Sequence, residues 1–157
     1  MFIIIQNITE MIITATDFLN SGLPISTDIR EDEITFAIKT VEQLYVKQMF
    51  GDEIWSDICQ HPTSYSELIN GTDTMAGLKV AELHAVFSYM IYDNQVLTRY
   101  HSIVKNDEHS DNPSRDDLLA LAKHHWEIFM IFVSECSKYA GAPKPTTYNN
   151  IIFSELC

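Results

Sequence analysis

The sequence predicts an all-α domain, a small bundle of about four principal helices with extended N- and C-terminal segments. Apolar residues recur at spacings of three and four along several long stretches, which is the period of one face of a helix. Strand-like sequence is confined to residues 1–5 and 146–153. The chain has 157 residues, 46% of them hydrophobic, which is enough for one domain with its own core.

The first predicted helix runs from residue 8 to residue 20. Asn7 is placed to cap its N-terminus, because a short polar side chain accepts hydrogen bonds from the first helical N–H groups. Gly22 and Pro24 end it, since glycine adopts left-handed conformations and proline cannot continue a helix.

The second predicted helix begins near Asp28, where Glu31 stands three residues on, as in a capping box. It closes at residues 50–51, and a short helix over residues 53–60 follows, stopping before Pro62. The inward face of the second helix is predicted to consist of Ile34, Ala37, Ile38, Val41, Leu44, Tyr45, Gln48 and Met49.

A polar segment over residues 63–73 is predicted to be a loop, with a turn at Asn70-Gly71. The third long helix then runs from about residue 74 to residue 103. Its apolar stripe is broad, and Phe87 and Ile91 lie off that stripe, so apolar side chains cover much of its circumference. Such a helix is expected at the centre of the bundle.

The fourth long helix is predicted from about Pro113 to Tyr139, with Asn112 as its N-cap. Gly141 suits the position that follows a helix C-terminus. The predicted inward face consists of Leu118, Leu119, Ala122, Trp126, Phe129, Phe132, Val133 and Cys136.

The sequence contains no recognisable catalytic or metal-binding motif. Histidine occurs without H-x-x-x-H or E-x-x-H spacing, so neither a zinc helix nor a di-iron bundle is predicted. His124 and His125 are neighbours that would point about 100° apart on a helix. We therefore expect core or surface roles for the six histidines, which are His61, His84, His101, His109, His124 and His125.

The sequence also lacks the motifs of other common catalytic and binding sites. There is no phosphate-binding glycine loop and no nucleophile elbow. Cys136 fits the apolar face of its helix and is expected to pack there. Asp93-Asn94 interrupts the third helix and is expected to hydrogen-bond to a neighbouring helix through Arg99 or His124. We predict that the protein is not an enzyme and needs no metal or other cofactor.

Three cysteines, Cys59, Cys136 and Cys157, form no C-x-x-C pair, and their odd number argues against a disulfide scaffold. A reducing compartment fits them better. The apolar start at residues 1–5 lacks a cationic region, so it is not expected to be a signal peptide, and no segment is long enough to span a bilayer.

The net charge of −12 argues against binding to nucleic acid or to an anionic membrane surface. Residues 28–73 include ten acidic residues but only three basic residues. These acids can form a solvated surface, or a wall that repels DNA and lets it pass without binding. The ten acids are Asp28, Glu31, Asp32, Glu33, Glu42, Asp52, Glu53, Asp57, Glu67 and Asp73.

The two ends of the chain are candidate docking segments. We divide the chain into a helical domain, residues 1–142, and an extended tail, residues 143–157, because Pro143-Lys144-Pro145 forbids helix. The tail either folds back on its own domain or docks on a neighbour. The residues expected to dock are Phe2, Ile3, Ile4 and Ile5 at the N-terminus and Tyr148, Ile151, Ile152, Phe153 and Leu156 in the tail.

The pattern over residues 34–54 resembles the second helix of tailed-phage head–tail connector proteins. In those proteins an amphipathic helix ends in an apolar-glycine pair and runs into a short helix, and here Phe50-Gly51 and Trp55 hold these places. Residues 83–109 are similar to the long helix and charged loop that follow. Over residues 28–140 the chain looks most like the adaptor or ring proteins of phages of Bacteroidetes, including crAss-like phages.

This resemblance implies a structural protein of the virion neck, assembled in the host cytoplasm. Such proteins form a ring of roughly twelve copies, bind the portal protein and other neck or tail proteins, and line the DNA channel without specific binding. Glu31, Asp32 and Glu33 are the acids expected to face that channel. Two alternatives remain: a cytosolic helical interaction module such as an adaptor or regulator, and an enzyme with a histidine or carboxylate site.

Overall fold

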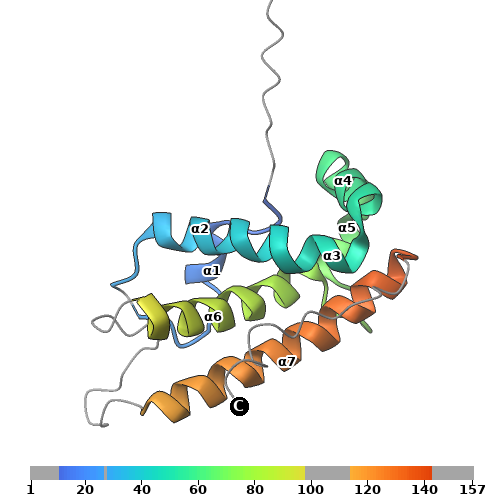
Figure 1. Cartoon of the computed structure of the whole chain (residues 1–157). Helices are drawn as coiled ribbons and strands as arrows, with labels where there is room; N and C mark the ends of the chain where they lie inside the picture. Colours follow the sequence, from blue (N-terminus) through green and yellow to red (C-terminus); the bar gives the residue numbers. More distant parts are fainter. Residues whose placement is uncertain (1–10, 27, 98–113, 143–157) are drawn as a thin grey trace, which may run out of the picture.

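The computed structural model describes residues 11–26, 28–97 and 114–142, and all the regular secondary structure within these ranges is helical (Figure 1). The predicted all-α class is therefore confirmed. The proposed docking segments at residues 2–5 and 143–157 lie outside the described residues. None of the helices in the described ranges combines the length and the apolar character needed to cross a membrane.

Helix α6 (Leu78–Leu97) lies between the other two long helices. It packs against α2 (Glu31–Val41) on one side and against α7 (Arg115–Tyr139) on the other (Figure 1). Phe87 and Ile91, which lie off the main apolar stripe, are as buried as the stripe itself. The predicted central position of this helix is confirmed, because neighbours on two sides require two apolar faces.

The first helix is shorter than predicted. Helix α1 (Ala15–Leu19) begins after Thr14, whose side chain accepts a hydrogen bond from the N–H of Asp17 while the Asp17 carboxylate accepts one from the N–H of Thr14. This reciprocal capping box fixes the start of the helix. The predicted start near residue 8 is wrong for residues 11–13, which are not helical.

The N-terminus of α2 also differs from its prediction. The helix begins at Glu31, with Arg30 in extended conformation as its N-cap and no side-chain capping bond. Asp28 lies two residues before that cap, too far along the chain to bond with the first helical turn. The predicted capping box from Asp28 is wrong, and the Arg30 side chain instead pairs with Asp32.

A π-helical turn, η1 (Glu42–Val46), separates α2 from α3 (Lys47–Phe50). A π turn accommodates one extra residue, so the inward face after it moves by one position. Leu44 and Gln48 were predicted to face inward, but both are exposed, whereas Val46, Met49 and Phe50 are buried. A uniform spacing of 3.6 residues per turn therefore predicts the wrong buried positions after this turn.

The segment predicted as a loop over residues 63–73 is largely helical. Helix α4 (Asp52–Gln60) ends before Pro62 as predicted, but a 3₁₀ turn, η2 (Pro62–Tyr65), and helix α5 (Ser66–Asn70) follow it. The predicted turn at Asn70-Gly71 is confirmed, with φ at +91° for Gly71. The returning backbone approaches so closely that a Cβ on Gly77 would lie 2.4 Å from the Gly71 nitrogen.

Helix α7 begins at Arg115, with Ser114 as its N-cap in a capping box with Asp117. The predicted cap, Asn112, and Pro113 lie outside the described residues, and the helix starts two residues later than expected. Its end at Tyr139 is confirmed, followed by Gly141 at a φ of +71°.

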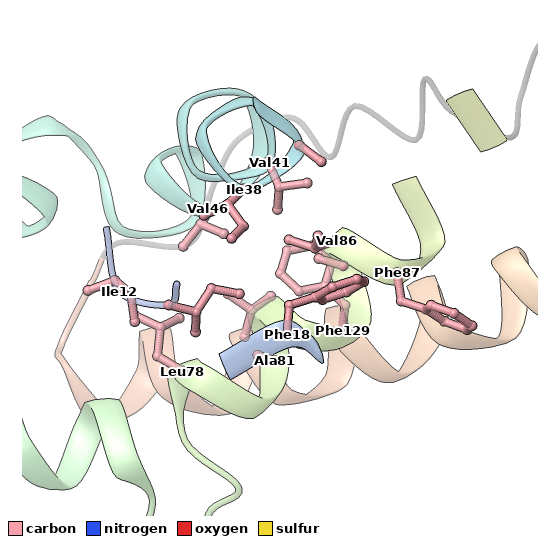
Figure 2. Packing of buried hydrophobic residues seen from close by; sticks show 14 of the residues in the cluster. Ile12, Phe18, Ile38, Val41, Val46, Leu78, Ala81, Val86, Phe87 and Phe129 are labelled. Carbon is pink, nitrogen blue, oxygen red and sulfur yellow. The ribbon is translucent and has the colours of Figure 1, made fainter. Parts of the chain in front are cut away.

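One hydrophobic core joins these elements. Figure 2 shows side chains from α1, α2, α6 and α7 meeting in it, among them Phe18, Ile38 and Val86. Phe129 of α7 is also fully enclosed. Every long helix contributes to the same cluster, so the described residues share one core.

Candidate functional site

A pair of buried carboxyl groups lies where the π-turn meets α6. Glu42 is the first residue of the π-turn and is 2% exposed, and Glu82 of α6 is completely buried. Ionisable side chains are rarely buried this deeply without a partner of opposite charge. The pair is the most unusual polar feature of the described core.

The two carboxyl groups have few partners. The backbone N–H of Ile12 donates to Oε1 of Glu42 at 2.8 Å. Neither oxygen of Glu82 receives a hydrogen bond from another group, and the Glu42 side chain is the polar group that lies against it. Two ionised carboxylates can only accept, so a hydrogen bond between them requires a proton on one of the two.

Burial raises the pKa of Glu42 to about 7, while the hydrogen bonds from Ile12 and Glu82 oppose that rise. Burial raises the pKa of Glu82 well above its ordinary value, and repulsion from the Glu42 charge adds to the effect. Because Glu42 accepts a hydrogen bond from Ile12 while no backbone donor among the described residues reaches Glu82, we assign the proton to Glu82, whose hydroxyl then donates to Glu42. At neutral pH the pair carries no more than one negative charge.

Two cysteine thiols lie near this pair. Cys59 of α4 and Cys136 of α7 both have a pKa raised to about 11, first by burial and then by nearby carboxylates. A thiol with such a pKa is protonated at neutral pH and is a poor nucleophile. Cys136 is fully buried, which confirms its predicted packing role.

A second polar pair joins α6 to α7. The Nδ1 atoms of His84 and His125 are 2.7 Å apart, and the two rings are stacked with centroids 4.9 Å apart. One ring donates its Nδ1–H and the other accepts, so the accepting ring must be neutral and at most one of the two rings can be protonated in this arrangement. Burial lowers the pKa of His125 to about 4, with further lowering by His84 and His124, and it lowers the pKa of His84 as well.

The histidine pair agrees with the expected structural role. His125 is 8% exposed while its neighbour His124 is exposed, as their predicted angular separation requires. Asp93 is partly buried, which raises its pKa. Its predicted partner Arg99 lies outside the described residues, so that interaction stays a prediction.

A third cluster lies at the surface on α4 and η2. The Asp57 carboxylate accepts a hydrogen bond from the Tyr65 hydroxyl and lies 2.9 Å from Nδ1 of His61. These bonds lower the pKa of Asp57, the Tyr65 bond most. The cluster borders an open hollow of about 350 Å³. Both His61 and Asp57 are more than half exposed, so water competes for each group and weakens the pair.

The acids predicted to face a channel are all at the surface. Glu31, Asp32 and Glu33 form the first turn of α2 and are exposed, with Asp32 paired to Arg30. Glu42 was counted with the same acidic segment, and that assignment is wrong because Glu42 follows the buried Ile38 by four residues and lies on the same buried face.

Large apolar side chains are exposed on two separate sides of the domain. Phe36 of α2 is 64% exposed and Leu44 of the π-turn is 49% exposed. Ile131 of α7 is 58% exposed. Because α2 and α7 pack on different sides of α6 (Figure 1), these exposed side chains belong to two different parts of the surface. We call them the α2 face, Phe36 and Leu44, and the α7 face, around Ile131.

Sequence reasoning missed both buried pairs. Glu42 follows the apolar Val41 within a buried stripe, and Glu82 stands between buried residues of α6. An acidic residue inside an apolar stripe is the signal from which a buried carboxyl group could have been predicted. The histidines of the second pair are 41 residues apart, and no local spacing links them. Asp57 and His61 have i, i+4 spacing, which a search for acid–histidine pairs on helices would have found.

Within the described ranges no group of three or more His, Cys, Asp or Glu side chains is arranged to hold a metal ion. Comparison of the chain with protein-family models, with curated proteins and with solved structures finds no match.

Proposed function

We propose that this chain is a structural subunit of a phage neck. Its copies assemble through two unlike faces into a ring that joins the portal to the tail. The observation on which the proposal rests is the exposure of large apolar side chains on two different faces, the α2 and α7 faces, of one well-packed domain. The resemblance of residues 28–140 to head–tail connector proteins supplies the biological setting.

Two different faces favour a ring over a dimer. A twofold dimer uses one self-complementary patch, whereas a head-to-tail contact joins two unlike patches and closes into a ring when the rotation allows. Phe36 projects from a helix whose opposite side is fully buried, so its exposure is not a consequence of loose packing. The α7 face of the next subunit is the partner we assign to it.

The acidic turn at residues 31–33 adds a second argument. Glu33 precedes Phe36 by three residues, so the acidic turn borders the proposed contact on the same helix. A lumen lined with repeated negative charges repels phosphate groups and lets DNA pass without adhering. The net charge of −12 is consistent with that role.

The test is the mass of the complex formed when the chain is co-expressed with the portal-sized product of a neighbouring gene, measured by native mass spectrometry. We expect an assembly of roughly twelve copies on the portal. Particles of one or two copies, with no portal bound, would contradict the proposal and favour the cytosolic interaction module.

A pair of variants locates the contact. Phe36→Asp places a charge in the α2 face and is expected to leave separate folded subunits, since Phe36 adds little to the core. Ser56→Asp adds the same charge at an exposed position of α4, a helix that belongs to neither face, and is the control. If Phe36→Asp subunits still form the ring, the α2 face is not the contact.

A further inference from the structure

We propose that Glu42 and Glu82 form a proton-operated latch, which holds residues 11–14 against the π-turn and α6 and releases them when the second carboxyl ionises. This inference does not depend on the proposed ring. It concerns a polar contact within the domain.

The latch joins three segments that are distant in sequence. Ile12 supplies a backbone N–H, Glu42 supplies the acceptor from the π-turn, and Glu82 supplies the second carboxyl from α6. Ile12 is 30 residues from Glu42, so this bond is a tertiary contact and not a helical one. Ile12 and Ile13 are buried beside it, which means that loss of the bond would also loosen apolar packing.

Few groups can compensate a second charge. The titratable groups of neighbouring elements whose pKa the pair affects are the thiols of Cys59 on α4 and Cys136 on α7, and both are neutral at physiological pH. Among the described residues, no lysine, arginine or histidine contributes to the pKa of either carboxyl. Lys79, one turn before Glu82, instead acts on Asp17.

The first and second ionisations therefore have different consequences. With one charge, Glu42 accepts hydrogen bonds from Ile12 and from the protonated Glu82, so its burial is compensated. When Glu82 also releases its proton to water, two facing carboxylates share one donor, the Ile12 N–H. A buried, uncompensated charge destabilises the closed state strongly.

The segment that opens is the one with the weakest attachment. Residues 11–13 are not helical, and the π-turn interrupts the regular α-helical hydrogen-bond pattern of its segment. Helix α6 is packed on two sides and has more contacts to lose. Ionisation is therefore expected to release residues 11–14 and the π-turn while α6 and α7 stay folded.

The test is amide hydrogen exchange of the full chain between pH 6 and pH 9, compared with Glu82→Gln at each pH. Glutamine keeps the shape and the donor but cannot ionise. For the Ile12, Ile13 and π-turn amides, we take the ratio of the exchange rate in the wild type to that in the variant. This ratio is expected to rise by about tenfold per pH unit once the pair ionises. The Phe129 and Val133 amides of α7 should keep a constant ratio.

Controls separate the latch from general destabilisation. Glu127→Gln, at an exposed position of α7, should behave as the wild type. Glu42→Gln provides a second non-ionising partner, and if neither core variant folds, the α7 amides of the wild type serve as the reference. A ratio that does not change with pH would overturn the proposal. A parallel rise at Phe129 and Val133 would also overturn it, since the pair would then affect the whole domain.

Discussion

Acid should break the histidine pair that joins α6 to α7. The 2.7 Å separation of the Nδ1 atoms of His84 and His125 has room for one proton between the rings. Protonation of both rings would place two N–H groups against each other in a largely buried site. We therefore predict that the pair makes the domain sensitive to acid, and that His125→Asn removes that sensitivity.

The size of the effect follows from the pKa of His125. A pKa of about 4 in place of the ordinary 6.5 corresponds to up to about 3 kcal/mol, at about 1.4 kcal/mol per pKa unit. Because the folded-state pKa is lowered, the unfolded chain takes up protons first. The contribution is fully present above about pH 6.5 and is lost as the pH falls toward 4.

The assay must separate this effect from that of the carboxyl pair. Glu42 and Glu82 have raised pKa values, so their contribution is greatest below pH 4.5 and decreases as the pH rises. The two pairs thus oppose each other between about pH 4.5 and 6.5. Measuring urea unfolding of the wild type and His125→Asn at pH 7.5 and 4.5 cancels the carboxyl contribution.

The difference in the free energy of unfolding between wild type and His125→Asn should decrease by up to about 3 kcal/mol when the pH is lowered from 7.5 to 4.5. His124→Asn is the matched control and should retain most of the wild-type dependence, because His124 is exposed and is the smallest of the causes that lower the pKa of His125. An equal cost of His125→Asn at both pH values would refute the reasoning, as would an NMR titration showing His125 protonated near pH 6.

Three further predictions concern the backbone, a buried hydrogen bond and the acidic turn. Gly77→Ala should lower the free energy of unfolding by at least about 2 kcal/mol, since its Cβ would lie 2.4 Å from the Gly71 nitrogen at a φ of +85°; wild-type stability in urea would show that the turn can relax. Ser137→Ala should cost about 1–3 kcal/mol, because the buried Ser137 hydroxyl donates to the Met49 carbonyl at 2.8 Å; a neutral effect in the same assay would mean that another donor replaces it. Replacing the exposed acids 31–33 with lysine should change folding by less than about 1 kcal/mol yet slow DNA passage in a phage infectivity assay, and unchanged infectivity would count against a channel position.

The C-terminal ends of the helices were predictable from the sequence, and several N-terminal starts were not. Gly51, Gly71 and Gly141 follow helix ends with positive φ, a conformation that few other residues adopt, so glycine marks these ends directly. Polar residues that can cap an N-terminus are more numerous, and tertiary packing selects among them. Thr14 and Ser114 are the caps that the fold uses, although other polar residues precede them.

The polar pairs could not be predicted for a related reason. Local spacing reports only neighbours within a helix, whereas Glu42 with Glu82 and His84 with His125 are brought together by packing between helices. Helical periodicity places Glu42 in line with Ile34 and Ile38, but its charged side chain was expected at the surface, so its burial was not predicted. The exposed acidic turn at residues 31–33 was predictable, since charged residues at a helix start remain in solvent.

The π-turn also determines how the segment 31–50 tolerates change. A constant helical period describes the residues before it and the residues after it, but the two runs are out of phase by one position. A charge-substitution scan should therefore show a tolerant position at Leu44 and an intolerant one at Val46, the reverse of what extrapolation from Ile34 and Val41 would give. Substitutions chosen from one uninterrupted helical wheel would place polar groups in the core from Val46 onward.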